Sequence, residues 1–596
     1  MFPTTRQFDS ALRIIAALRA KGHQAYLAGG CVRDLLLGRE PHDFDVATSA
    51  TPDVVLRLFP RTFAVGAHFG VVLVATSGEA DAATCGGADA AYAAIEEMDK
   101  SAQVVTEVAT FRSDGAYSDG RHPDAVRYTS SAEEDVRRRD FTINGLLLDP
   151  EWVFPQGLKP GLNYEALSAR LKSCPDTRPG SNQVFSQPIK SGLLAEMNAG
   201  TKKAAEKLGI SDEIDSESFS GAKALVDSGG IMRGLKLPPP SALNSSTACK
   251  TAVDSIGFLL GINSRSTDRP NYLAACEAGG LQDAVIDHVG GLADLQAGII
   301  RAIGEPAERF EEDHLRMLRA VRFAARFGFQ IDPATAAAIR RLASKTKAVS
   351  RERVRDELTK MLTEGRARQA FELLDESGLL AEILPEIARM KGVEQPPQFH
   401  PEGDVWTHTL GLLGQLEAGC SATLAWGALL HDVGKPPTFR RADRIRFDGH
   451  VDVGVAIAAE ICRRFRFSND ETRQTLTLIE NHMRFADAPR MKASTLKRFF
   501  RLENFPEHLA LHRMDCLAGS RNLEHWNFVR ERHAAMPEEA VRPKPLLTGR
   551  ELIAAGYRPG AAFKEMLRAV EDAQLEGSIA TEEEALRFIQ ERFPLD

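Results

Sequence analysis

Apolar positions follow two different periods along this chain. In the first 150 residues, short β-branched runs alternate with stretches of helical spacing. Strands are predicted over residues 24–27, 69–74 and 104–112, with another beginning at Asp43. Helices are predicted over residues 8–18, 31–37 and 52–58. Beyond residue 283 almost every apolar stretch has three- and four-residue spacing, which indicates helices alone.

Two stretches fit neither period. Residues 76–103 are rich in Ala, Gly and Asp, and we interpret them as a surface insertion. Residues 151–282 are rich in Ser, Gly and Pro and include three consecutive prolines at 238–240. Such a composition predicts a partly disordered excursion, or a small inserted domain, whose ends lie close together.

Composition narrows the class of protein. The 596 residues, 43% of them hydrophobic, are enough for about three to five domains. No apolar run approaches the length of a bilayer span, and the start lacks a signal-peptide profile, so we expect a cytoplasmic protein without a membrane partner. Eight scattered cysteines without a Cys-x-x-Cys pair suit a reducing compartment.

The charge is acidic overall but uneven. A net charge of -8 argues against a general nucleic-acid coat. Two local basic clusters remain as candidate RNA contacts, or simply as solvated helix faces. They are residues 340–368 and the set Lys492, Lys497, Arg498 and Arg501.

A phosphate-binding turn is predicted near the N-terminus. Gly29 and Gly30 follow a strand and precede a helix, so backbone N–H groups at the positive helix end can approach an anion. Arg33, one turn into the helix, can add a full charge.

Paired carboxylates follow this turn. Asp43 and Asp45 are two residues apart at a strand, so they point to the same face, and Glu107 on a later strand is placed to approach them as a third acid. Two such carboxylates are costly unless a hard cation such as Mg²⁺ lies between them, which indicates metal-assisted phosphoryl or nucleotidyl transfer.

Together these motifs resemble the signature of the tRNA nucleotidyltransferase and bacterial poly(A) polymerase family, class II. They are the glycine pair, Arg33-Asp34 and Asp43-x-Asp45. The resemblance implies a polymerase-beta-like palm, with Glu107 completing the carboxylate set. The resemblance further implies that Arg139 and Asn144, in the run that begins at Arg137, contact the nucleotide. It also implies that residues 114–123 form a flexible loop that helps nucleotide choice.

A polar stripe is predicted on a helix over residues 310–329. It consists of Asp313, Arg316, Arg319 and Arg322. A carboxylate accepts from an exocyclic amine while a guanidinium donates to the neighbouring ring nitrogen, an order that cytosine and adenine fit and guanine and uracil do not. The stripe resembles the family's amino-acid template, which implies that Asp313 and Arg316 read the base while Arg319 and Arg322 bind the triphosphate.

The second half of the chain contains another set of candidate functional residues, and His450 and His482 lie between its members in the sequence. The set is His408, His431, Asp432 and Asp515. It resembles the HD phosphohydrolase module, in which imidazole and carboxylate groups bind a divalent metal that activates water; a transition metal is the candidate here.

We therefore predict an α+β protein: a mixed-sheet palm followed by an all-helical remainder. The domains are a palm (1–150), the insertion (151–282), a template helix with neck and body (283–390), an HD domain (391–535) and a helical tail (536–596). The predicted function is addition of C-C-A to the 3′ end of tRNA from CTP and ATP with Mg²⁺.

Alternatives remain open from the sequence. Enzymes that add only A, only C-C, or poly(A) need the same amine-bearing base edge. An HD phosphohydrolase whose front half serves as an RNA-binding module is a rival of another class. The oligomeric state and the HD substrate are not predicted.

Overall fold

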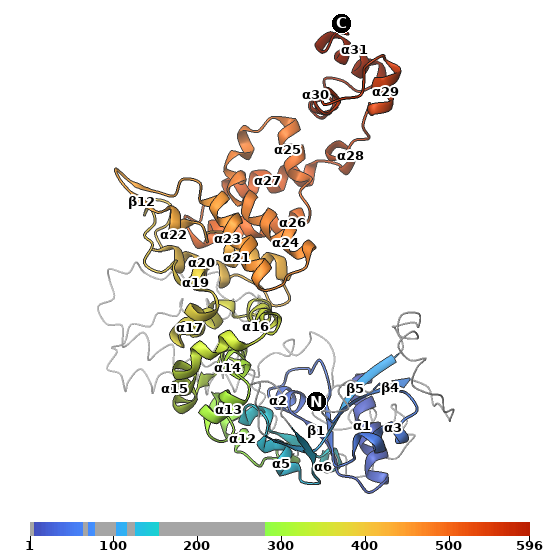
Figure 1. The fold of residues 1–596 in the computed structure, drawn as a ribbon, viewed down its shortest axis with the longest axis vertical. Helices are drawn as coiled ribbons and strands as arrows, with labels where there is room; N and C mark the ends of the chain where they lie inside the picture. The colour runs from blue at the N-terminus through green and yellow to red at the C-terminus, as the bar shows by residue number, and fades with distance from the viewer. Residues whose placement is uncertain (1–4, 64–69, 78–102, 116–124, 154–280, 596) are drawn as a thin grey trace, which may run out of the picture. The chain divides into compact units, whose positions relative to one another are not determined.

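The computed structural model describes residues 5–63, 70–77, 103–115, 125–153 and 281–595. Most of the predicted insertion over 151–282, of the nucleotide-choice loop over 114–123 and of the insertion over 76–103 lies outside these residues. Figure 1 shows a strand-containing N-terminal part and helices through the rest of the described chain. None of the described helices has the length and apolar character that a membrane span requires.

The N-terminal part is built on one mixed seven-stranded sheet of order β3-β4-β5-β2-β1-β8-β9. Strands β2 and β5 run parallel, and the other pairs are antiparallel. The strands are β1 (Ala25–Ala28), β2 (Val46–Thr48), β3 (Thr62–Phe63), β4 (Val71–Ser77), β5 (Gln103–Thr110), β8 (Leu147–Leu148) and β9 (Val285–Ile286). The mixed sheet confirms the predicted fold class.

The sheet also joins the two sides of the long insertion. Leu148 in β8 is paired with Val285 in β9, and the Asp149 amide donates to the Ala284 carbonyl at 2.9 Å. The ends of the interruption therefore lie side by side, as predicted. A segment that leaves and re-enters at neighbouring strands does not disturb the register of the sheet.

Helix α1 (Arg6–Ala20) shows how the local sequence determines this part. Thr5 caps it by accepting from the Phe8 amide, and its apolar side chains recur at helical spacing. Ile14, Ile15 and Leu18 are completely buried, because this face packs against the sheet. The helix α3 (Pro52–Leu58) has the predicted bounds, and α2 (Gly30–Leu36) begins one residue before the predicted start.

Strand bounds differ from the predictions at three places. Asp43 and Asp45 precede β2 rather than forming its beginning. Thr76 and Ser77 belong to β4 and Gln103 to β5, so these ends of the predicted surface insertion are sheet. The strand predicted over 104–112 is interrupted at Phe111, which is completely buried, and β6 (Arg112–Asp114) pairs instead with β7 (Val126–Tyr128).

The single helix predicted over 310–329 is wrong. The chain forms α13 (Pro306–Glu312) and α14 (Leu315–Phe327), separated at Asp313 and His314. Asp313 has extended backbone angles (φ −145°, ψ 105°), and its Oδ1 accepts from the Leu315 amide at 3.0 Å. A short acidic side chain that bonds the neighbouring backbone competes with helical hydrogen bonds, which explains the break.

The remaining helices form the second half of the chain. Those that follow α14 are α15 (Pro333–Leu342), α16 (Arg351–Thr363), α17 (Ala367–Glu376) and α18 (Leu379–Ile383). Next come α20 (Val405–Leu413), α21 (Ala422–Leu430), α22 (Lys435–Thr438), α23 (His450–Arg464), α24 (Asn469–Asn481), α25 (Ala493–Phe500) and α26 (Phe505–Ala518). Helix α21 packs against both α24 and α26, which brings distant parts of the sequence together.

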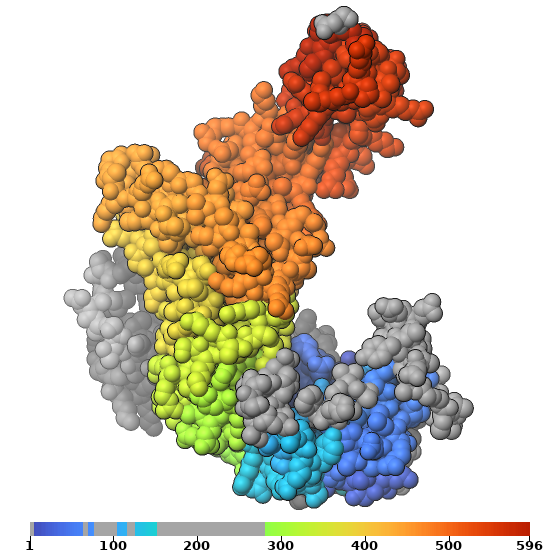
Figure 2. Space-filling model, in the orientation of Figure 1, coloured from blue at the N-terminus to red at the C-terminus, as the bar shows by residue number. Residues whose placement is uncertain are grey.

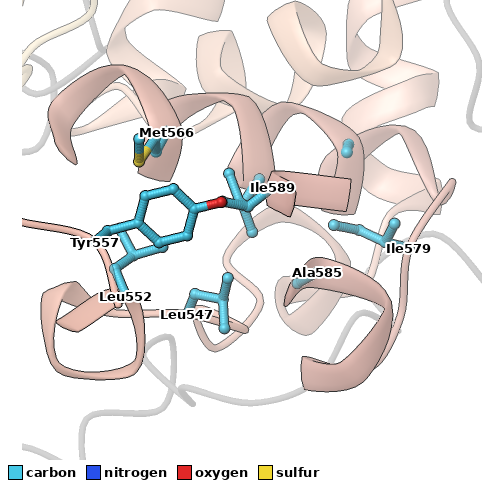
Figure 3. Packing of buried hydrophobic residues seen from close by; sticks show 9 residues of the cluster. Leu547, Leu552, Tyr557, Met566, Ile579, Ala585 and Ile589 are labelled. Carbon is cyan, nitrogen blue, oxygen red and sulfur yellow. The ribbon is translucent and has the colours of Figure 1, made fainter. Parts of the chain in front are cut away.

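The C-terminal helices α29 (Gly549–Ala554), α30 (Ala562–Glu576) and α31 (Glu582–Arg592) have their own apolar core. Figure 3 shows the Tyr557 ring among Leu552, Met566 and Ile589. Acidic residues of α30 bind the basic cluster of α25: Arg498 pairs with Glu571 at 2.8 Å, and Lys497 donates to the Leu575 carbonyl at 2.7 Å. These basic side chains are therefore occupied by the tail rather than left as the predicted RNA contact.

Candidate active site and metal centre

The glycine pair forms a tight passage between β1 and α2. Gly29 has a φ of 73°, and a Cβ at this position would lie 2.9 Å from Nη1 of Arg139. Any other residue would be strained there and would also displace that guanidinium. The predicted turn is therefore also the place where Arg139 lies against the backbone.

The predicted acids lie where the chain enters β2, beside its parallel neighbour β5 in the middle of the sheet. We call Asp43, Asp45 and Glu107 the acidic edge. Asp43 is exposed, Phe44 is buried and Asp45 is half-buried, so side chains alternate as they do in a strand. Glu107 is one position before Val108, which is paired in register with Val46. The structure thus brings Glu107 beside the segment that carries the two aspartates.

The charges of these acids act on one another. Burial, then the charges of Glu107 and Asp43, raise the pKa of Asp45 to about 6, against the opposite effect of Arg139. Burial and the charge of Asp43 likewise raise the pKa of Glu107. Such mutual effects require carboxylates that face the same space.

The three carboxylates fit a cation. Within the described part of the chain, no side-chain oxygen of Asp43, Asp45 or Glu107 accepts a hydrogen bond or forms an ion pair. Oxygen donors with unused lone pairs are the ligands that hard divalent cations take. The three do not form a group whose ligand atoms all lie within 4.8 Å of one another, as several histidine-containing groups do.

Arg33 and Asn144 face the interior. Arg33 is 4% exposed, bonds Asp34 at 2.8 Å and donates to Oδ1 of Asn144 at 2.5 Å. Its guanidinium also lies over the rings of Phe323 and Phe327 of α14, 5.3 and 4.7 Å from their centroids. In this arrangement Arg33 connects α2 to α14.

Arg139 lies closer to the acids. It donates to Oδ2 of Asp135 at 3.1 Å and to the Asn144 carbonyl at 3.3 Å, while its Nε is buried without a partner. Because it affects the pKa of both Asp45 and Glu107, its charge faces the acidic edge.

The predicted template pair lies at the break between α13 and α14. Oδ2 of Asp313 accepts from Arg353 of α16 at 2.8 Å. Arg316 donates to Glu312 at 2.5 Å and to the Arg138 carbonyl at 3.3 Å. The last contact links the template region to the residue before Arg139, so Arg316 and the acidic edge are connected through a short stretch of backbone.

Arg319 and Arg322 are held by carboxylates. Arg319 bonds Asp140 at 2.8 Å, and Arg322, 5% exposed, bonds Glu357 at 2.6 Å. Burial alone would raise the pKa of Asp140, but the charge of Arg319 and hydrogen bonds from Asn144 and Arg319 lower it.

Sequence reasoning missed the partners of this stripe: Asp140, Arg353 and Glu357. Asp140 directly follows Arg139 but has no role in the predicted site, and the other two lie in residues 340–368, which the sequence marks only as a basic cluster.

The second group of predicted residues converges tightly. Ligand atoms of His408, His431 and Asp515 lie within 4.8 Å of one another, as do those of Asp432, His450 and His482. His431 Nε2 is 3.1 Å from Oδ2 of Asp432, so the two groups meet. Reasoning from the sequence noted His450 and His482 as lying between the predicted ligands but did not include them.

Backbone contacts orient three of these histidines. Nδ1 of His431, His450 and His482 lies 2.9, 2.9 and 2.6 Å from the carbonyl three residues earlier. A carbonyl only accepts, so each Nδ1 carries the hydrogen and each Nε2 presents a lone pair. Burial lowers the pKa of His482 to about 4, which keeps that ring neutral.

These Nε2 lone pairs face the carboxylate of Asp432, which is itself a hydrogen-bond acceptor. Nε2 of His431, His450 and His482 lies 3.1, 3.9 and 3.9 Å from oxygens of Asp432. The Nε2 atoms of His431 and His450 are buried without a hydrogen-bond partner, and Oδ2 of Asp432 forms an ion pair with Lys435 at 2.7 Å. Imidazole nitrogens and a carboxylate that converge in this way fit a divalent metal ion.

His408 has a second carboxylate behind it. Its Nδ1 lies 2.6 Å from Oε1 of Glu402, and its Nε2 lies 2.9 Å from Oδ1 of Asp515. Burial opposes the charged ring, but the hydrogen bonds to Asp515 and Glu402 raise the pKa of His408 to about 9. Glu402 was missed because it lies in the loop before α20, outside the helical pattern.

Three family models match the chain. The poly(A) polymerase head domain matches residues 25–155, the probable RNA and SrmB-binding site of polymerase A matches 328–391, and the HD domain matches 405–519.

Two relatives are matched over most of their own length. The A-adding tRNA nucleotidyltransferase of Deinococcus radiodurans is 34% identical over 51% of this chain and 74% of its own. The CC-adding tRNA nucleotidyltransferase of Thermus thermophilus is 36% identical over 50% and 70%. The multifunctional CCA protein of Thioalkalivibrio sulfidiphilus is 42% identical over 33% and 48%.

A solved structure shares the fold. The Bacillus stearothermophilus CCA-adding enzyme in complex with CTP aligns with a TM-score of 0.56 at 22% identity, over 99% of this chain and 98% of that chain. Because the identity is low, this likeness supports the architecture and not a residue's role. On the sequence relatives and the head-domain match, the chain belongs to the tRNA nucleotidyltransferase family and is a nucleotidyltransferase that carries an HD domain.

Proposed function

We propose that this nucleotidyltransferase adds or repairs the 3′-terminal C-C-A of tRNA, using CTP and ATP and releasing pyrophosphate. The observation that carries the proposal is the acidic edge, where Asp43, Asp45 and Glu107 face one space with unused oxygens. Both tRNA and nucleoside triphosphates are available in the cytoplasm, where we expect the enzyme to act.

Asp43 and Asp45 would hold Mg²⁺, with Glu107 as the third acid. Bound Mg²⁺ would supply charge neutralisation at the triphosphate and activation of the terminal 3′ hydroxyl. The chain's own contribution is to hold these carboxylates together on a rigid sheet, since β2 and β5 fix the spacing between the aspartates and Glu107.

Binding of the triphosphate is assigned to Arg139, with Gly29 and Gly30 allowing close approach of the backbone. Arg139 has a buried, unpaired Nε and already faces the acidic edge. Arg33 and Asn144 act behind it, because their mutual bond fixes α2 to the turn Thr142–Asn144, while the Arg33 guanidinium lies over Phe327 of α14. Arg319 can bind a phosphate only if the phosphate replaces Asp140 as its partner, and Arg322 only if it replaces Glu357.

Base choice is assigned to Asp313 and Arg316. An aspartate accepts from the exocyclic amine and an arginine donates to the ring nitrogen, so C and A satisfy both groups. Guanine and uracil would leave polar groups unpaired, which costs on the order of several kcal/mol. Arg353 supports this pair, since its bond to Oδ2 fixes the carboxylate at the break between α13 and α14.

The assay uses the full chain with tRNA that lacks its C-C-A end, Mg²⁺ and each labelled nucleoside triphosphate. Incorporation of C, C and then A supports the proposal. Addition of A only to tRNA ending in C-C, or of C-C only, would assign the chain to the narrower activities named in its relatives. Long A tails would indicate a poly(A) polymerase, and no incorporation would refute the transferase.

Asp313→Ala tests the template directly. We expect discrimination between CTP and UTP to fall by about tenfold or more, because loss of the acceptor removes one of the two hydrogen bonds that read the base. Glu308→Ala, an exposed position on α13, is the control. Full C/A selectivity in Asp313→Ala would contradict the template assignment.

For the HD domain we propose a metal-dependent phosphohydrolase. His408, His431, Asp432 and Asp515, with His450 and His482, would hold one or more divalent transition metal ions, which would activate water for attack on a phosphate ester. Hydrolysis of p-nitrophenyl phosphate with Mn²⁺, Co²⁺, Ni²⁺ and Zn²⁺ supplied in turn tests this activity; no hydrolysis with any of them would refute it.

A further inference from the structure

A short arginine-rich hairpin leaves the HD domain beside its metal-binding group. Strands β12 (Arg440–Arg441) and β13 (Ile445–Arg446) form it, and it projects at the edge of the domain in Figures 1 and 2. Residues 440–446 are exposed except Ile445. They contain four arginines and one aspartate, in a chain whose net charge is -8.

The base of the hairpin is fixed at the metal-binding group. On one side Lys435 bonds Oδ2 of Asp432 at 2.7 Å, and on the other side His450 faces Oδ1 of the same residue at 3.9 Å. The rings of Phe439 and Phe447 meet below the strands, with centroids 5.9 Å apart. The chain therefore leaves the group and returns to it within one short excursion.

A second contact holds the hairpin beside the loop that precedes α20. Arg441 bonds Glu394 at 3.1 Å, and the neighbouring residue Gln395 accepts from Lys435 at 2.7 Å. This loop continues to His400 and Glu402, which belong to the same cluster. Both ends of the hairpin are therefore held next to the metal-binding group.

The charges on the hairpin are poorly neutralised. Arg440 lies directly opposite Arg446 in the antiparallel pair, an arrangement of like charges that destabilises a hairpin. Arg446 is bound by Asp443 at 3.1 Å, but no described residue pairs with the side chains of Arg440 and Arg444. A two-stranded hairpin of this length is already marginal alone, so the unpaired charges do not contribute to its stability.

Other basic clusters differ from this one. In α25 and in α14 the arginines are bound by carboxylates of neighbouring helices, for example Arg498 by Glu571 and Arg322 by Glu357. Unpaired guanidinium groups in a rigid, exposed arm are suited to phosphate oxygens, which they bind in a bidentate manner.

We propose that this hairpin binds the phosphate backbone of an RNA strand whose terminal phosphate lies at the HD metal-binding group. The inference rests on the proposed phosphohydrolase and deepens it: the substrate is an RNA end rather than a free mononucleotide.

The experiment compares the full-length wild type with the double variant Arg440→Gln/Arg444→Gln. Arg463→Gln/Arg490→Gln is the matched control, because both of those arginines are exposed, at 75% and 79% of the side chain, and lie within the HD domain. Hydrolysis of a short single-stranded RNA with a 3′ phosphate is measured against p-nitrophenyl phosphate.

We expect the ratio of kcat/KM for RNA to that for p-nitrophenyl phosphate to fall about tenfold in the hairpin variant, through KM, and not in the control. The salt dependence should also weaken, since each lost contact with single-stranded RNA lowers the log–log slope by about 0.7. An unchanged ratio would overturn the proposal.

Hydrogen–deuterium exchange supplies a test that does not depend on hydrolysis. The RNA should slow exchange in residues 439–447 of the wild type and of the control, but not of the hairpin variant. No protection in the wild type, or equal protection by poly-glutamate, would overturn the RNA assignment. Absence of p-nitrophenyl phosphate hydrolysis with every metal would refute the phosphohydrolase, while the exchange result still decides the function of the arm.

Discussion

The acidic edge of the palm and the histidine group of the HD domain differ in how complete they are. Six histidine and aspartate side chains of the HD group converge from five helices and their ends, with ligand atoms within 4.8 Å inside each triplet. The palm offers Asp43, Asp45 and Glu107, which face one space without forming such a triplet.

The contacts that hold the ligand side chains in place are also more complete in the HD group than in the palm. In the HD group, backbone carbonyls fix His431, His450 and His482, and Glu402 fixes His408. In the palm no described residue bonds the three carboxylates, and the positive charge that lowers the pKa of Asp45 and Glu107, against the acids' effect on one another, comes from Arg139. Mg²⁺ usually takes one or two carboxylates and completes its shell with water and substrate phosphates, whereas imidazole-rich sites supply the ligands themselves.

From this comparison we infer that the protein alone assembles the HD site, whereas the palm site needs its nucleotide to complete the metal's ligands. This difference predicts that the HD group binds metal in the free protein, and that the palm binds it strongly only together with CTP or ATP.

Asp43→Ala should have the largest effect. Removing one of the two carboxylates that hold Mg²⁺ should reduce nucleotide addition by about a thousandfold or more, because the metal supplies several kcal/mol of transition-state stabilisation. Hydrolysis of p-nitrophenyl phosphate should be unchanged, since the HD group does not include this residue. Nucleotide addition near the wild-type rate would contradict the assignment of the palm acids.

Asp432→Asn should give the reverse result. This residue contacts His431 and faces His450 and His482, so its loss should lower transition-metal affinity by more than the roughly 100-fold typical of a supporting residue. Calorimetry with the metal alone measures the affinity, and nucleotide addition serves as the internal control. Equal loss of both activities would mean that the two sites are not independent.

Glu402→Gln should have an intermediate effect. The glutamate accepts from Nδ1 of His408 and presents Nε2 to the group, so the amide should lower metal affinity by about 10- to 100-fold. Glu480→Gln, an exposed change on α24, is the control. If Glu402→Gln bound metal as tightly as the wild type, Glu402 would have no positioning role.

Metal addition without mutation should have the smallest effect. At about 100 times its dissociation constant, a transition metal should raise the free energy of unfolding by about 2.7 kcal/mol. Mg²⁺ should give little stabilisation until CTP is present. Thermal unfolding with each metal, with and without CTP, measures this, and strong stabilisation by Mg²⁺ alone would contradict the proposed difference.

Sequence patterns predicted the sheet well because its strands carry β-branched residues and the helices carry regular apolar faces. They failed at Asp313, where one side-chain bond to the Leu315 amide overrides a strong helical pattern. They also missed the break after Thr110, where the completely buried Phe111 separates β5 from β6 and β6 pairs with β7 instead.

In the sites, motif spacing found residues that share an element but not those that arrive from elsewhere. Asp43 and Asp45 are two residues apart in the sequence, and His431-Asp432 is a dipeptide. Glu402, Arg353 and Asp140 act through contacts made after folding, such as the bond of Arg353 to Asp313 across 40 residues. Such partners have no spacing signal, and only packing shows them.

Anomalous scattering from crystals soaked in Mn²⁺ tests the central difference most directly, because Mn²⁺ substitutes for Mg²⁺ and also binds imidazole groups. With Mn²⁺ alone we predict a peak between His431 and Asp432 and none beside Asp43 and Asp45. With Mn²⁺ and CTP, a second peak should lie between those aspartates and the triphosphate. No metal at Asp43 and Asp45 in the presence of CTP would contradict the account.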